Sequence, residues 1–158
     1  MRLVRFAVIA PLLLGAARAL ADPEPALRCE ATARGAHATF DLTTKGAAQM
    51  TVAVSGGVVT CPLRVRSLYD RPKAKQPEAG LDLTLDLAAC KPALPNAEQF
   101  LAEIAIRLAL RGERNLPKGR VQWMKDEQPG ECAVSAWDHA AIEVLAEKRQ
   151  KRSASAER

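Results

Sequence analysis

Apolar and polar residues alternate with a period of two through most of residues 27 to 88. This pattern places the apolar side chains of each run on one face of a β-strand. The breaks between the first four runs, at 34–35, 44–46 and 55–57, are short and contain glycine, which is typical of tight hairpins. A fifth strand, 81–87, follows a longer loop at 69–80. The alternation therefore predicts an antiparallel meander.

After Cys90 the pattern changes to a helical period. Asn96 with Gln99 resembles a capping box, and Gly112 supplies a stop, so the sequence predicts a helix between them. Its apolar stripe comprises Phe100, Leu101, Ile104, Ala105 and Leu108. Ile106 and Leu110 lie off this stripe, where either a wide interface buries them or they face a partner.

The last part of the chain predicts a hairpin carrying Cys132 and then a second helix, opened by Ser135 and Asp138. Its apolar stripe comprises Trp137, Ala140, Ala141, Val144 and Leu145. The predicted fold is α+β: an antiparallel meander sheet of about five strands plus a C-terminal hairpin, packed against two helices. Residues 22–149 form a single domain in this interpretation, and residues 150–158 form a disordered basic tail.

Residues 1–21 have the features of a signal peptide that is cleaved on export. A short basic start precedes an apolar stretch, and Ala19 and Ala21 place small residues where a signal peptidase reads them. Pro11 and Arg18 leave the apolar stretch shorter than the roughly 18 residues of a membrane span. We therefore expect a periplasmic or secreted protein with no membrane span after cleavage.

Export places the four cysteines, Cys29, Cys61, Cys90 and Cys132, in an oxidising compartment. Their wide spacing argues against a zinc site, so two disulfides are predicted, with no metal and no cofactor. The adjacent strands that carry Cys61 and precede Cys90 favour a 61–90 bridge, which leaves Cys29 for Cys132. The alternative bridge between Cys29 and Cys61 requires a sheet that curls or closes, because flat strands lie about 4.8 Å apart.

The charge distribution argues against nucleic acid as a partner. The full chain has a net charge of +5 and a calculated pI of about 9.3. Removal of residues 1–21 leaves 20 basic and 18 acidic residues, and the remaining excess lies in the C-terminal tail. The folded part is therefore nearly neutral.

No residue pattern indicates catalysis. His37 and His139 are the two histidines that could act as a base, but neither has a nucleophile and an acid at recognisable spacing. The carboxylates Asp82 and Asp86 fit the solvated face of a strand. Few aromatic residues remain outside the predicted core, which argues against a carbohydrate-binding platform.

The most informative predicted surface is cationic and centres on the loop 69–80. Its members are Arg64, Arg66, Tyr69, Arg71, Lys73 and Lys75. Pro72 and Pro77 stiffen the loop, and a 61–90 bridge would tie its base, so less entropy is lost on binding. An ordinary solvated loop is the simpler interpretation. If functional, this surface suits a negatively charged partner, either a protein or an anionic envelope polymer.

These observations predict an exported, non-enzymatic accessory, binding or inhibitor-like protein of a bacterial-type envelope that acts through the loop 69–80. The alternative is an envelope enzyme or assembly subunit whose catalytic residues follow no readable motif.

Overall fold

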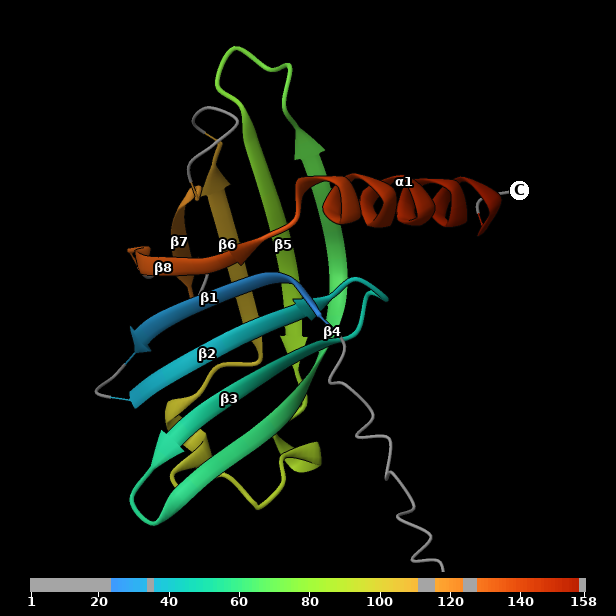
Figure 1. Cartoon of the computed structure of the whole chain (residues 1–158). Helices are drawn as coiled ribbons and strands as arrows, with labels where there is room; N and C mark the ends of the chain where they lie inside the picture. The colour runs from blue at the N-terminus through green and yellow to red at the C-terminus, as the bar shows by residue number, and fades with distance from the viewer. Residues whose placement is uncertain (1–23, 34–35, 111–115, 124–127, 157–158) are drawn as a thin grey trace, which may run out of the picture.

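The computed structural model is a closed antiparallel β-barrel with one α-helix at its C-terminal end (Figure 1). It describes residues 24–33, 36–110, 116–123 and 128–156. Each strand pairs with the next along the chain, and the last strand pairs with the first. The strands are β1 Pro25–Ala33, β2 Ala36–Thr43, β3 Ala48–Val54, β4 Gly57–Arg71, β5 Glu78–Leu85, β6 Glu103–Ala109, β7 Lys118–Gln122 and β8 Gly130–Trp137.

The predicted fold class is wrong, because in the described residues the sheet has eight strands, closes on itself and has one α-helix beside it instead of two. The predicted first helix is strand β6, preceded by a short 3-10 turn at Ala97–Gln99. Asn96 adopts a left-handed conformation and forms no side-chain cap, so the expected capping box is absent. The meander of the first five strands is present.

The assignment of residues 103–109 to strand β6 explains why Ile106 did not fit the predicted helical stripe. Ile104, Ile106 and Leu108 are all buried, while Glu103 before them and Arg107 among them are exposed. A short apolar run with polar residues at intervals is compatible with both periods, and here tertiary pairing with β5 and β7 selects the strand. Ile106 therefore contributes to the barrel interior and faces no partner.

The barrel interior is filled by side chains from the inward face of the strands. Phe40, Phe100 and Trp123 form a buried aromatic group, in which the ring centroids of Phe40 and Phe100 lie 5.4 Å and 5.9 Å from that of Trp123. Met50, Leu81 and the three apolar residues of β6 are also fully buried. The apolar face predicted for each strand is thus the lining of a closed core.

Both disulfides have the pairing that the sequence favoured, Cys61–Cys90 and Cys29–Cys132. Strand pairing explains each of them. Thr60 of β4 forms an antiparallel bridge with Lys91, which brings the adjacent Cys61 and Cys90 together. Closure of the barrel places β1 beside β8, so Cys29 meets Cys132 across neighbouring strands.

Helix α1, His139–Ala156, begins later and ends later than predicted. Strand β8 continues through Trp137, and Asp138 accepts a hydrogen bond from the Ala141 amide (3.0 Å), so Asp138 is the capping residue. Residues 150–156 are helical where a disordered tail was predicted. Lysine, arginine and alanine favour helix even without an apolar stripe.

The two halves of α1 differ in their surroundings. Ile142, Leu145 and Ala146 are buried against the barrel, chiefly near β4 and β1. Gly46, in the β2–β3 turn, has φ +87° and lies so close that an added Cβ would be 3.2 Å from Leu145 Cδ2. From residue 147 onward the helix projects away from the barrel (Figure 1). No helix of the described residues is both long and apolar enough to cross a bilayer.

Candidate functional site

The loop singled out in the sequence joins two long strands, β4 and β5, that pair as far as Arg71 and Glu78. This β4–β5 hairpin extends past the rest of the barrel at the top of Figure 1. At its turn the Ala74 amide donates to the Arg71 carbonyl (3.3 Å). The Leu110 amide donates to the Pro77 carbonyl (2.9 Å) and supports the hairpin from the side of β6. Strand pairing, and not proline alone, therefore fixes where the loop points.

Tyr69 is clamped at the base of this hairpin. Its ring lies against Gly80, where an added Cβ would come within 2.6 Å of ring atoms. The guanidinium carbons of Arg71 and Arg107 lie 4.9 Å and 5.7 Å from the ring centroid, within cation–π range. Burial raises the pKa of Tyr69 above its ordinary value, outweighing the nearby arginines. Tyr69 thus stiffens the hairpin base.

Two of the predicted binding cations are already paired with carboxylates. Arg71 Nη1 lies 3.6 Å from Glu78 Oε1, and Arg66 Nη1 lies 2.6 Å from Glu103 Oε1. These arginines are half or more exposed, so the pairs are weak, but they neutralise part of the predicted patch. Two of the cations predicted for binding therefore have part of their charge neutralised by neighbouring carboxylates.

A third arginine, Arg107 of β6, joins these ion pairs into a network on the outer face of the barrel. It was not singled out from the sequence. Its Nη2 lies 2.6 Å from Asp82 Oδ1, and Ser67 donates a second hydrogen bond to the same carboxylate. Burial acts to raise the pKa of Asp82, but the hydrogen bonds from Ser67 and Arg107 lower it overall. Assigning 103–109 to a strand would have placed Arg107 on the outer face beside Gly80.

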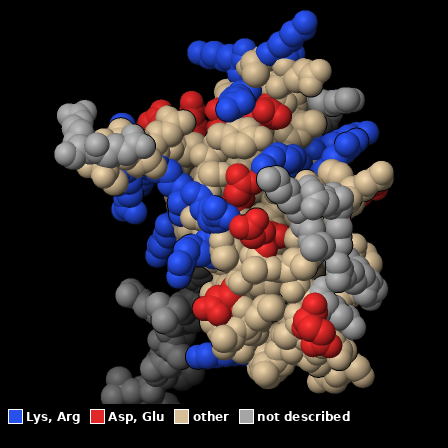
Figure 2. All heavy atoms as spheres, turned by 180° about the vertical axis from the view of Figure 1, so that it is seen from behind, with Lys and Arg blue, Asp and Glu red and all other residues tan. Residues whose placement is uncertain are grey.

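The network surrounds a shallow cleft of about 430 Å³ on the outer face of β4, β5 and β6. Figure 2 shows the mixed acidic and basic side chains of the face seen from behind. The charged residues that line the cleft are Arg66, Asp82, Glu103 and Arg107. Because acids and bases alternate and pair, the cleft carries little net charge.

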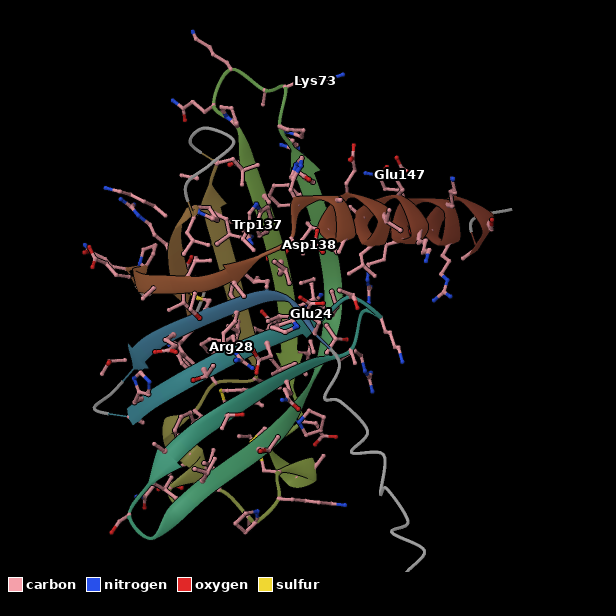
Figure 3. The ribbon with its side chains drawn as sticks, in the orientation of Figure 1. Glu24, Arg28, Lys73, Trp137, Asp138 and Glu147 are labelled. Atoms are coloured by element: carbon pink, nitrogen blue, oxygen red, sulfur yellow. A yellow bond between two sulfur atoms is a disulfide. The ribbon has the colours of Figure 1, made fainter. Side chains whose placement is uncertain are left out.

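The hairpin tip differs from its base. Lys73 and Lys75 are exposed, and neither has an ion pair among the residues that the structure describes. Figure 3 shows Lys73 at the top of the molecule, pointing away from the barrel. Of the six predicted binding residues, these two present free charge at the tip.

Arg64 does not belong to the tip. It lies seven residues before Arg71 on β4, which corresponds to about 23 Å along a strand. Its neighbour Leu63 pairs with Ala48, so Arg64 lies beside the β2–β3 turn. The structure therefore divides the predicted site into a tip (Lys73, Lys75), a paired base (Arg66, Tyr69, Arg71) and a distant cation.

The two histidines lie on different elements and have different carboxylate partners. His37 of β2 lies 3.6 Å from Glu30 at the edge of an open cleft of about 1020 Å³. His139 begins α1, and its Nε2 lies 2.9 Å from Asp70 Oδ2. They do not converge on one pocket with a nucleophile. Within the described parts of the chain, no cluster of three or more His, Cys, Asp or Glu residues could hold a metal ion.

Asp70 is the most deeply buried carboxylate near the hairpin, with 2% of its side chain exposed. Burial raises its pKa, Glu143 acts in the same direction, and the adjacent His139 opposes both. The pair links the end of β4 to the start of α1. Its position between two packed elements suits a structural contact.

Comparisons of the chain with models of protein families, with curated proteins and with solved structures find no match. The functional argument therefore rests on the geometry of this chain alone. The two disulfides indicate a location outside the cytoplasm. The predicted signal peptide, residues 1–21, lies outside the described residues and stays a prediction.

Proposed function

We propose that this protein is an exported, non-enzymatic binding protein of the cell envelope that presents the tip of its β4–β5 hairpin to an acidic protein partner. The observation that carries the proposal is the pair of exposed cations at the tip, Lys73 and Lys75, which have no ion pair with any described residue and lie on a hairpin that extends past the barrel (Figure 3). A negatively charged surface would gain attraction and faster association from both cations.

The base of the hairpin supports this role by reducing the flexibility of the tip. Tyr69 rests on Gly80 between two arginines, and Arg71 is further tied to Glu78. The Cys61–Cys90 bridge fastens the far end of the same strand. A hairpin that is already rigid loses little conformational entropy when it binds. Its affinity for a partner is therefore higher than that of a flexible loop.

The shape favours a concave protein partner over an extended anionic polymer. A narrow projecting hairpin can enter a cleft, as an inhibitor-like segment does, whereas a polymer is better held by a groove of cations. The two clefts near the hairpin are lined by acids as well as bases, which suits an anionic polymer less than a groove lined by cations alone. An enzymatic function has less support, because His37 and His139 lie apart, each beside its own carboxylate.

Site-specific crosslinking in cells tests the proposal. A photoreactive amino acid in place of Ala74, between the two lysines, should form an adduct with one protein partner. The yield should fall at least fivefold when Lys73 and Lys75 are both changed to Gln. The control position is Val58, which is 58% exposed in the β3–β4 hairpin.

Two results would contradict this assignment. One is the same adduct from positions 74 and 58, since that would indicate random encounter. The other is an adduct from position 74 whose yield is unchanged by Lys73→Gln and Lys75→Gln together, since the cations would then contribute nothing.

A further inference from the structure

The projecting half of α1 carries an unusual charge distribution. Residues 147–156 include four cations and one acid, and none is buried. At 100° per residue, Lys148, Arg149, Lys151 and Arg152 fall within about 160° of the helix circumference. Glu147 lies at the edge of this arc, on the upper side of the helix in Figure 3. The four cations therefore form a basic face that spans about 6 Å of the axis of the projecting half.

Two cations on other elements extend this face onto the barrel. Leu145 packs on Gly46, so the next helical turn, with Lys148 and Arg149, lies beyond the β2–β3 turn that carries exposed Lys45. Arg64, exposed on β4, lies beside that same turn because Leu63 pairs with Ala48. Figure 2 shows Lys and Arg gathered on the side of the molecule from which α1 projects.

The basic surface therefore consists of Lys45, Arg64, Lys148, Arg149, Lys151 and Arg152. Two acids lie beside this surface: Glu147 adjoins Lys148 in sequence, and the backbone carbonyl of Glu24 accepts a hydrogen bond from the Thr44 amide in the turn (3.3 Å). None of the six cations has an ion pair in the described part of the chain. Six cations against two acids on a nearly neutral protein form a local positive field.

We propose that this basic surface holds the protein against the anionic phospholipid headgroups of a membrane. The cations are spread along a projecting helix and lie in no cleft, which suits an extended surface better than a compact ligand or a polymer chain. Residues 147–156 contain no apolar side chain larger than alanine, so the helix lies on the headgroups without inserting. Each cation close to such a surface contributes to binding, and salt weakens the attraction.

Vesicle sedimentation tests this with the purified protein at 50 mM salt. Vesicles of phosphatidylcholine with 30% phosphatidylglycerol should bind the protein, and pure phosphatidylcholine should not. In the test variant Lys148, Arg149, Lys151 and Arg152 are all changed to Gln, and binding should fall at least tenfold. In a second variant, Lys45→Gln with Arg64→Gln, vesicle binding should fall about threefold. Because both changes lie outside the helix, this variant still tests the proposal if the first one disturbs α1.

The charge-matched control changes four cations elsewhere, Lys73, Lys75, Lys91 and Lys118, to Gln and should bind almost normally. Salt at 500 mM should abolish binding of the unaltered protein. Equal losses in test and control variants would overturn the proposal, because net charge alone would then explain binding. Binding to soluble polyphosphate without binding to the anionic vesicles would also overturn it. Because the hairpin tip is altered only in the control, this result is independent of the function proposed for Lys73 and Lys75.

Discussion

The wall of the barrel and the two elements that leave it differ in almost every physical property. The wall is crosslinked twice, lined by apolar side chains and paired along every strand. The hairpin tip and residues 147–156 of α1 contain no fully buried residue, and their cations have no ion pair among the described residues. Stability should therefore depend on the wall and recognition on the projecting elements. Changes in one region should leave the property of the other intact.

Loss of the Cys29–Cys132 bridge should have the largest effect on stability. The bridge spans 103 residues and joins the first strand to the last. Changing both cysteines to Ser should lower the free energy of unfolding by about 3–5 kcal/mol, because a long closed loop restricts the unfolded chain most. Urea unfolding measures this. The matched Cys61→Ser, Cys90→Ser variant, with a separation of 29, should lose less, and the reverse order would contradict the closure of the barrel.

Ile106→Ala should cost about 2–4 kcal/mol, because the side chain is 1% exposed in the barrel interior. Lys73→Gln with Lys75→Gln should stay within about 0.5 kcal/mol of the unaltered protein, as expected for exposed residues. Urea midpoints of both variants compare wall and tip directly. A small effect at Ile106 would mean that residues 103–109 form a surface helix and not strand β6.

Gly80→Ala should cost about 1–3 kcal/mol, because the new Cβ would overlap the Tyr69 ring. In a Tyr69→Ala background, Gly80→Ala should lower the free energy of unfolding by only a few tenths of a kcal/mol, since the ring that the new Cβ would overlap is absent. Thermal unfolding of the four proteins of this cycle gives the coupling. Additive effects would show that Tyr69 does not rest on Gly80.

Asp70 should give a smaller, pH-dependent effect. Burial raises its pKa in the folded protein, so the folded state binds the proton more tightly than the unfolded chain. The sign follows: as pH rises from the ordinary pKa of 3.8 through the folded value, Asp70 ionises and folding loses stability. Relative to Asp70→Asn, the unaltered protein should therefore gain stability as pH falls through this window. Unfolding curves between pH 3 and 7 measure the difference, and a constant gap would contradict it.

Much of the wall could be predicted from alternation alone. The first four strands and the Cys61–Cys90 pairing follow from period-two patterning and short glycine-containing turns, and the structure contains them. Strand β6 could not be assigned, because Ile104 and Leu108 fit a helical stripe as well as a strand. The two interpretations differ at Ile106, which fits only the strand.

The candidate site was only partly predictable for the same reason. Lys73 and Lys75 lie in a turn, where exposure follows from local sequence. The pairing of Arg66 with Glu103 depends on β6 lying beside β5, a contact between residues far apart in the chain. Local patterns do not carry that information.

The sequence by itself determined which residues are apolar on each strand, where the tight turns occur and which cysteines are available to pair. Only the tertiary structure decided that the sheet closes, because closure depends on β8 finding β1 across more than a hundred residues. The same long-range pairing set the outer-face partners of the arginines, whereas the cations of the tip and of α1 have no carboxylate partner in the parts of the chain that the structure describes. Periodicity is a property of neighbours along the chain, whereas closure and charge pairing are properties of neighbours in space.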